Sequence, residues 1–356
     1  MQNFTMINSI NGKKILKILF ATAALTIVCF CKKTKAQAVK KEESNIFLAD
    51  PAIFYHHNNY YLYGTVEGNT GNGFKVYTSK DMEHWEIDTT IRNGFALKKG
   101  EAYGTSNFWA PQVFYYNNIF YMAYAADENI VIAAGSDPAG PFTQQTIRQL
   151  DAPVKQIDPF VFIDDDGKKY LYHVRLTNGN KIFVAEMEKD LSAIKPATLK
   201  ECITATTAWE NSANSRWPVT EGPSVIKHNN IYYLFYTAND FRNPDYAVGY
   251  ATSNTPYGPW EKYTGNPIIS KKNIGINGTG HGDFVTDAQH QLIYVFHTHF
   301  SDSAVTPRRT AIIKVKFVKD KKTGIDQLQI NEKSFRFATI KKINFLKMPC
   351  NRQCIK

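Results

Sequence analysis

Residues 219–238 read VTEGPSVIKHNNIYYLFYTA, a stretch with the pattern of a β-hairpin that opens on a carboxylate. Glu221 comes first and is followed by a Gly-Pro pair and a short apolar run. Asn229 and Asn230 then supply the turn conformations that a tight hairpin needs. The aromatic run after this turn has the composition of a second strand. The stretch therefore predicts two antiparallel strands, with Glu221 at the mouth of the first.

The same phrase occurs four more times along the chain. The other copies are ADPAIFYHHNNYYLYGT from Ala49, WAPQVFYYNNIFYMAYA from Trp109, IDPFVFIDDDGKKYLYH from Ile157 and HGDFVTDAQHQLIYVFHT from His281. The five copies align on a proline or its equivalent, with anchors at Pro51, Pro111, Pro159, Pro223 and Asp283. A turn follows each anchor at a similar distance, so each copy predicts one hairpin.

A second hairpin follows most copies, and its clearest markers are GSDPAGPFT (135–143) and TSNTPYGPWEKY (252–263). Two hairpins per unit predict about four antiparallel strands per unit. Five such units predict an all-β, five-bladed β-propeller, in which neighbouring blades bury each other's faces. A β-sandwich with long insertions would not explain the common distance from anchor to turn. Residues 39–356 are predicted to form this single domain, and the segment from Ser334 either completes a blade or packs outside it.

The first 38 residues predict a secretory signal. Three lysines, an apolar run at 15–31 and an Ala-Gln-Ala site at 36–38 have the order typical of such a signal. A membrane anchor is the weaker alternative because the apolar core is short for a span. A lipoprotein signal at Cys29 or Cys31 is a further alternative, although the residues before each cysteine are bulkier than usual. We therefore expect a secreted or periplasmic protein.

The charge of the chain argues against nucleic acid as a partner. The predicted signal contains six lysines and no acidic residue, so its removal lowers the formal net charge from +10 to +4. No basic stripe interleaved with aromatic residues remains. The sequence also implies no protein partner.

The openings of the five phrases are the candidate functional residues. They are Asp50, Trp109, Asp158, Glu221 and His281. The innermost strands of a propeller surround one axis, and residues at the same end of these strands point into a shared funnel. Three acids, a tryptophan and a histidine that lie far apart in sequence are therefore predicted to converge.

The segments LADP, FWAPQV, QIDPFVF, TEGPSV and GTGHGDF, in this order and register, resemble glycoside hydrolase family 43 over roughly residues 45–320. This is the family of five-bladed arabinosidases, xylosidases and arabinanases. The resemblance implies that Asp50 is the general base, Glu221 the general acid and Asp158 the carboxylate that tunes and orients the acid. It implies an aromatic wall at Trp109, and at His281 an axial histidine, often associated with a water-coordinated Ca²⁺ or Na⁺.

The chemistry of glycoside cleavage is consistent with these roles. One protonated carboxyl must deliver a proton to the leaving oxygen, and a second, ionised carboxyl must activate water. In the inverting geometry the two groups stand far enough apart to admit that water. A third acid near Glu221 would raise its pKa by like-charge repulsion and keep it protonated near neutral pH.

Other residues have less specific signals. Arg308 and Arg309 follow the last hairpin, where the family often places a basic residue near the bound sugar; either arginine fits, and a surface pair is the alternative. Trp209 and Trp217 flank a polar loop before Glu221. This loop is either the rim of a sugar subsite, where aromatic faces contact sugars, or ordinary packing.

These observations predict a secreted, inverting exo-glycosidase. It would release terminal α-L-arabinofuranosyl or β-D-xylosyl residues from plant oligosaccharides or polysaccharides. One alternative is a galactan-directed member of the same family, a galactosidase or galactofuranosidase. Another is a non-catalytic carbohydrate-binding propeller, and a third is a retaining five-bladed fructan hydrolase.

Overall fold

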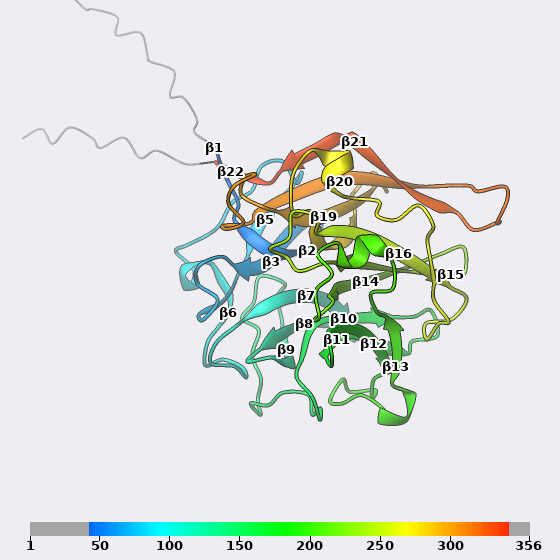
Figure 1. Cartoon of the computed structure of the whole chain (residues 1–356). Helices are drawn as coiled ribbons and strands as arrows, with labels where there is room; N and C mark the ends of the chain where they lie inside the picture. The colour runs from blue at the N-terminus through cyan, green and yellow to red at the C-terminus, as the bar shows by residue number, and fades with distance from the viewer. Residues whose placement is uncertain (1–42, 342–356) are drawn as a thin grey trace, which may run out of the picture. The chain divides into compact units, whose positions relative to one another are not determined.

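The computed structural model describes residues 43–341, which form small antiparallel sheets arranged around a central axis (Figure 1). The predicted five-bladed propeller is confirmed. The predicted signal at 1–38, with Cys29 and Cys31, lies outside the described residues, as do residues 342–356.

Each blade is built from strands that follow one another in sequence. Blade one contains β2 (Leu48–His56), β3 (Asn59–Val66) and β5 (Tyr77–Ser79), with β4 (Gly73–Lys75) and β6 (Phe95–Lys98) forming a small separate sheet. Blade two contains β7 (Trp109–Tyr116), β8 (Ile119–Ala126) and β9 (Asn129–Gly135). Blade three contains β10 (Gln156–Ile163), β11 (Lys169–Leu176), β12 (Asn180–Glu186) and β13 (Lys200–Ile203). Blade four contains β14 (Thr220–His228), β15 (Ile231–Ala238), β16 (Ala247–Ser253) and β17 (Glu261–Lys262). Blade five contains β18 (Gly280–Thr286), β19 (Leu292–Thr298), β20 (Arg309–Val318) and β21 (Gln327–Phe337).

The prediction of about four strands per blade holds for blades three, four and five. Blades one and two have three-stranded main sheets. In each of them a single bridge stands in place of an outermost strand, between Thr78 and Glu86 in blade one and between Ala134 and Thr143 in blade two.

Helical structure is confined to short turns between strands. These are η1 (Arg92–Gly94), η2 (Pro196–Thr198), η3 (Ala208–Asn211) and α1 (Lys271–Ile274). Within residues 43–341, no helix has the length and apolar character needed to cross a membrane.

The first and last described strands pair with each other. β1 (Glu43–Asn45) is antiparallel to β22 (Thr339–Lys341). Next to this pair, Ile46 N donates to Ala338 O at 2.9 Å, and Thr310 N donates to Ile46 O at 3.1 Å. The segment from Ser334 therefore completes blade five in β21, and the residues after it pair with β1 at the start of the domain.

The core is divided into five clusters, one between each pair of adjacent blades. Blades one and two bury Tyr63 and Tyr124 against each other, and blades three and four bury Tyr172 and Tyr236. Corresponding clusters lie between blades two and three, four and five, and five and one. The innermost strands are held in a ring by this packing, and residues at one end of them face the same axis.

Each innermost strand begins with the same backbone irregularity. The hydrogen-bond register shifts near the start of each strand, and the residue at the shift has a positive φ. These residues are Asp50 (φ 49°), Ala110 (47°), Asp158 (53°), Gly222 (58°) and His281 (45°). Such a bulge redirects a side chain, and positive φ in a residue other than glycine persists only where its surroundings enforce it.

The bulges correct one detail of the predicted repeat. Because His281 is the bulge residue of β18, the residue equivalent to the prolines of the other blades is Gly282. The predicted anchor at Asp283 is therefore wrong by one position.

Candidate active site

The bulge residues are tied together by hydrogen bonds from one blade to the next. A left-handed bulge residue turns its N–H away from its own ladder, and that donor then needs another partner. Four of the five donors find a side chain of the preceding blade: Ala110 N donates to Thr65 Oγ1 (3.0 Å), Gly222 N to Asp158 Oδ2 (3.1 Å), His281 N to Thr237 Oγ1 (2.8 Å) and Asp50 N to His297 Nδ1 (3.1 Å).

Three of these acceptors occupy one register position. Thr65, Thr237 and His297 each lie on the second strand of a blade, opposite the residue just before the bulge. We did not predict a role in the site for them, although the repeat contains the signal. Near their ends the second strands contain LYGT (62–65), LFYT (234–237) and YVFH (294–297), in each of which the fourth residue is the polar one that accepts the hydrogen bond.

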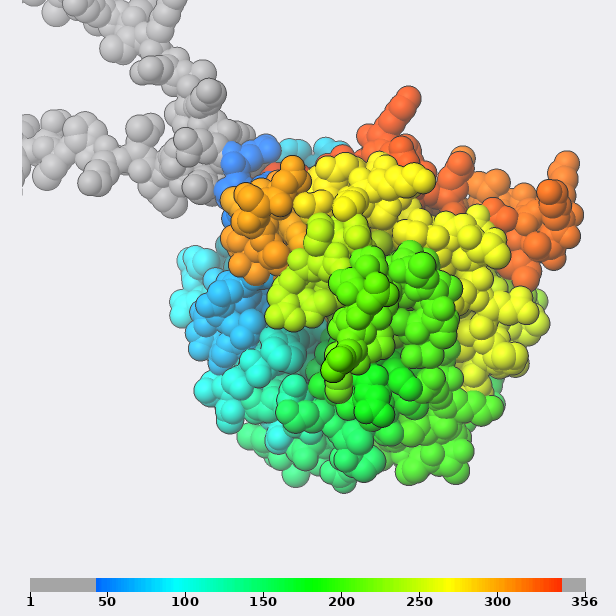
Figure 2. Space-filling model, viewed as in Figure 1, coloured from blue at the N-terminus to red at the C-terminus, as the bar shows by residue number. Residues whose placement is uncertain are grey.

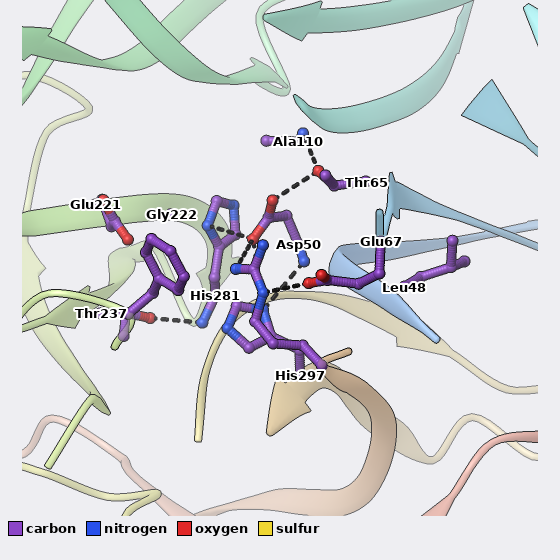
Figure 3. A network of polar contacts seen from close by, with 12 residues as sticks. Leu48, Asp50, Thr65, Glu67, Ala110, Glu221, Gly222, Thr237, His281 and His297 are labelled. Atoms are coloured by element: carbon purple, nitrogen blue, oxygen red, sulfur yellow. Dashed lines mark hydrogen bonds and ion pairs between the residues drawn. The ribbon is translucent and has the colours of Figure 1, made fainter. Parts of the chain in front are cut away.

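Asp50 lies at the centre of this network (Figure 3). Thr65 Oγ1 donates to Asp50 Oδ2 at 2.6 Å. His281 Nδ1 lies 3.3 Å and Arg308 Nη1 3.4 Å from Asp50 Oδ1. Both carboxylate oxygens therefore have close polar partners.

These partners keep Asp50 ionised. Burial alone would raise its pKa, but the positive charges of His281 and Arg308 and the hydrogen bond from Thr65 hold the pKa well below its ordinary value. His297 adds no charge, because burial lowers its own pKa well below the ordinary value of 6.5. Its Nδ1 accepts the Asp50 N–H and must be unprotonated.

Glu221 lies at the start of β14 and has the opposite shift. Tyr246 Oη donates to its Oε1 at 2.8 Å, and Asn180 Nδ2 donates to its Oε2 at 2.9 Å. Burial and the nearby carboxyl of Asp158 outweigh these two donors and raise the pKa of Glu221 to about 7. The like-charge effect expected from the sequence is present, although burial is the larger cause.

Asp158 lies between the other two acids. His281 Nδ1 is 3.7 Å from Asp158 Oδ2, so one imidazole faces both Asp50 and Asp158. Burial and the charge of Asp50 raise the pKa of Asp158 to about 8, against the lowering effect of the Gly222 N–H. The three acids therefore comprise one group that stays ionised to low pH and two groups that hold their protons to a higher pH than usual.

These side chains open into a cavity of about 410 Å³. This volume lies within the roughly 300–1,000 Å³ typical of small-molecule sites. Its walls include Trp109, Trp217 and Phe241, together with Asn180, Asp240, Arg242 and Arg308. The space-filling view shows a hollow near the centre of one face, bordered by green and lime atoms from the middle of the chain (Figure 2).

The two predicted arginines have different positions. Arg308 Nε donates to Glu67 Oε1 at 2.5 Å, and its guanidinium lies 4.6 Å from the ring centroid of Phe241 in the cavity wall. Arg309 does not line the cavity. Its guanidinium lies 4.1 Å from the ring centroid of Phe337, and its Nε donates to His299 O. Of the predicted pair, the structure brings only Arg308 to the acids.

The two predicted tryptophans differ in the same way. Trp217 is 47% exposed and lines the cavity. Trp209 packs against Tyr236, with ring centroids 5.8 Å apart. The rim interpretation fits Trp217, and the packing interpretation fits Trp209.

Comparison with known proteins identifies the family to which this geometry belongs. Residues 44–323 match the family described as Glycosyl hydrolases family 43. The chain belongs to this family. It is a glycoside hydrolase by family, and the family implies a carbohydrate substrate.

Individual family 43 relatives differ in their activities. A crystal structure of an endo-1,4-β-xylanase from Bacteroides thetaiotaomicron VPI-5482 is 39% identical, with a TM-score of 0.76, over 85% of this chain and 100% of that one. A xylosidase/arabinosidase from Butyrivibrio fibrisolvens is 26% identical over 68% of this chain, and the match spans only 47% of that longer protein. A β-D-galactofuranosidase from Aspergillus niger is 24% identical over 76% of this chain and 79% of its own length.

The cation predicted at His281 has few protein ligands available. Within residues 43–341, no group of three or more His, Cys, Asp or Glu side chains is placed to hold a metal ion. His281 Nδ1 already faces Asp50 and Asp158. A cation held through water at His281 stays a prediction, and the chemistry derived below uses no metal.

Proposed function

We propose that this family 43 glycosidase is an inverting, exo-acting enzyme that removes terminal α-L-arabinofuranosyl or β-D-xylosyl residues from plant oligosaccharides and polysaccharides. One observation carries the proposal. Asp50 and Glu221 open into one cavity, and their surroundings shift the two pKa values in opposite directions. A general base and a general acid need this pair of protonation states.

In the proposed reaction, Glu221 donates its proton to the glycosidic oxygen as the bond from that oxygen to the anomeric carbon breaks. A water molecule attacks the anomeric carbon from the opposite side and gives a proton to Asp50. The products are a free sugar of inverted configuration and the shortened chain. Proton exchange with solvent then restores both carboxyl groups. No covalent intermediate forms, in contrast to a retaining enzyme.

The other predicted residues have supporting roles. The Asp158 carboxyl is one of the groups that raise the pKa of Glu221, and it accepts the Gly222 N–H beside the acid. Trp109 provides an apolar wall against which a sugar ring packs. Arg308 and His281 hold the Asp50 carboxylate and offer N–H donors toward sugar hydroxyls.

Pentose substrates are supported by the relatives. The Bacteroides structure is of an endo-1,4-β-xylanase, and the Butyrivibrio protein is a xylosidase/arabinosidase, so both act on pentose sugars by their names. A site for a terminal sugar is supported by the loop residues Trp217 and Phe241, which form walls of the cavity. We further propose a secreted or periplasmic location, on the basis of the signal pattern in residues 1–38.

The second candidate is a galactofuranosidase, which the Aspergillus relative favours. A non-catalytic sugar-binding role is disfavoured, because such a role gives no reason for three carboxyl groups to converge at one axis.

A panel of 4-nitrophenyl glycosides tests the proposal: α-L-arabinofuranoside, β-D-xylopyranoside, β-D-galactopyranoside and β-D-galactofuranoside. We expect the highest kcat/KM for one of the two pentosides. A clear preference for the galactofuranoside would establish the second candidate instead. NMR of the first-formed sugar should show the inverted anomer, and a retained anomer would overturn the mechanism.

A further inference from the structure

A chain of two side-chain hydrogen bonds joins the rim of the cavity to Glu221. Trp217 Nε1 donates to Asn180 Oδ1 at 2.9 Å. Asn180 Nδ2 then donates to Glu221 Oε2 at 2.9 Å. All three residues line the cavity. Asn180 has no counterpart in the repeated phrases, because it opens the third strand of blade three.

Trp217 determines which way the amide of Asn180 points. An indole N–H can only donate, so the amide group facing Trp217 must be the oxygen. The NH₂ group must then face Glu221. Without the indole N–H, the amide is free to rotate by 180° and present its oxygen to Glu221.

The two amide orientations have opposite effects on a proton donor. An NH₂ group stabilises the carboxylate that forms as the proton leaves. An amide oxygen would accept the proton of the neutral acid and hold it away from the substrate. The other groups around Glu221 are Tyr246, Asp158, His281 and Asp50, and Tyr246 donates to the opposite carboxyl oxygen. The remaining charged groups of the cavity are Arg308 and the Asp240–Arg242 ion pair.

The backbone holds Trp217 and Asn180 together. Asn180 N donates to Pro218 O at 3.0 Å, directly after Trp217, and Thr220 Oγ1 donates to Asn180 O at 3.1 Å. A displacement of the Trp217 loop therefore moves Asn180 as well. The indole is 47% exposed, whereas the side chains of Asp50 and Arg308 are only 11% and 12% exposed, deeper in the cavity.

We propose that Asn180 is a positioning residue for the proton donor, and that Trp217 both fixes the amide of Asn180 and contacts the leaving-group part of a carbohydrate substrate. This inference rests on the proposed role of Glu221. It assigns the exposed side of the cavity to the leaving group. Contact between the leaving group and Trp217 would then be coupled, through Asn180, to the orientation of Glu221.

The test compares leaving groups of different basicity on the sugar that the wild type prefers. A dinitrophenyl leaving group departs without a proton, whereas a methyl or sugar leaving group requires one. We expect Asn180→Ala to lower kcat on the methyl glycoside about 10- to 100-fold and on the dinitrophenyl glycoside less than about threefold. Trp217→Phe keeps an aromatic face but removes the N–H. It should produce the same selective loss of kcat, about 3- to 10-fold, with KM for an oligosaccharide nearly unchanged.

Two controls make the result specific. Trp217→Ala should in addition raise KM for the oligosaccharide, because the aromatic face is lost. Asn59→Ala removes an exposed amide that bonds only to His57 O in a hairpin turn, and it should leave both substrates unaffected.

Equal losses on both substrates, or no loss, in Trp217→Phe and Asn180→Ala would overturn the inference. Trp217 is exposed, so its Phe variant tests the idea even where Asn180→Ala folds poorly. A failure of the proposed function is a different result: the wild type itself would then cleave neither substrate, or Glu221→Gln would leave turnover of the methyl glycoside unchanged.

Discussion

Asp50 and Glu221 are carboxyl groups in the same cavity with different neighbours. Asp50 accepts a hydrogen bond from Thr65 and faces Arg308 and His281, whereas Glu221 lies close to Asp158. The first set of neighbours favours the ionised form, and the second disfavours it. The two roles therefore follow from a few contacts around chemically similar side chains.

The first prediction concerns the pH dependence of kcat/KM. Glu221 must carry its proton in the free enzyme, so kcat/KM should fall about tenfold per pH unit above a pKa of about 7. On the acid side, kcat/KM should stay constant down to about pH 4. This is roughly the ordinary pKa of an aspartate, and the pKa of Asp50 lies below that value. Profiles are measured for wild type and Glu221→Gln on a dinitrophenyl glycoside and a methyl glycoside. A basic limb that persists unchanged in Glu221→Gln would assign it to another group.

At the residue scale, the sequence predicted the acids together with His281 and the Arg308–Arg309 pair, but not the partners of Glu221. Asp50, Asp158 and Glu221 were found because the repeat places them at equivalent ends of inner strands. Asn180 and Tyr246 escaped prediction because they reach Glu221 from parts of the chain outside the repeated phrase. Which of Arg308 and Arg309 faces the acids depends on strand register at the start of β20, and two adjacent arginines in a sequence do not reveal it.

At the scale of strands, the bulges and their inter-blade hydrogen bonds position the acids. Thr65 is fully buried and serves twice, because it accepts the Ala110 N–H and donates to Asp50. In Thr65→Val the valine side chain has a shape similar to that of threonine, but it leaves the Ala110 N–H without an acceptor. We expect its free energy of unfolding to fall by about 1–3 kcal/mol and kcat/KM to fall about 3- to 30-fold.

Thr65→Ser is the matched control because it retains the hydroxyl group. Chemical denaturation and kinetics at one pH compare the two variants. A Ser variant as impaired as the Val variant would mean that the methyl group, and not the hydrogen bonds, matters at this position.

Gly222 provides a second prediction at this scale. It has φ +58°, and a Cβ there would approach His281 Cγ to 2.8 Å. Gly275, at the end of α1, has φ +74° and open space around the same position. Both Ala variants carry backbone strain of about 1 kcal/mol, but only Gly222→Ala must displace His281.

We therefore expect Gly222→Ala to lower kcat/KM at least about tenfold, and Gly275→Ala to leave it unchanged. Thermal unfolding should show a larger decrease in Tm for Gly222→Ala. Equal activity in the two variants would mean that the cavity tolerates a shifted His281.

At the scale of the whole molecule, a buried acid with a raised pKa costs stability. The folded protein retains the Glu221 proton to a higher pH than the unfolded chain does. The contribution of this group to stability is therefore lost as pH rises from about 4.5 to about 7. Glu221→Gln should exceed the wild type in free energy of unfolding by about 1–3 kcal/mol at pH 8, and the difference should vanish near pH 4.

Denaturant titrations of both proteins at pH 4 and pH 8 measure this difference. Gln can donate to Tyr246 Oη and accept from Asn180, so both neighbouring side chains keep a hydrogen bond to this position. A Gln variant that is less stable than the wild type at pH 8 would contradict a raised pKa for Glu221.

The architecture of the molecule was predictable, whereas the walls of its cavity were not. Repeated hairpins at similar spacing specify five blades, since each blade needs its neighbours to bury its faces. The segments at the rim, Trp217 and Asp240–Arg242, lie between the repeated strands. Their conformation depends on contacts that no periodic pattern records. The repeat pattern also predicted a fourth strand in blades one and two, where the structure has only single bridges.

The central claim is that Asp50 acts as general base and Glu221 as general acid. The most direct test is kcat/KM of Asp50→Asn and Glu221→Gln on a dinitrophenyl glycoside and on a methyl glycoside. We predict that Glu221→Gln loses about a hundred- to ten-thousand-fold on the methyl glycoside but less than about tenfold on the dinitrophenyl glycoside, and that Asp50→Asn loses about a hundred- to ten-thousand-fold on both. Near-wild-type activity of Asp50→Asn, or equal losses of Glu221→Gln on the two substrates, would contradict the assignment.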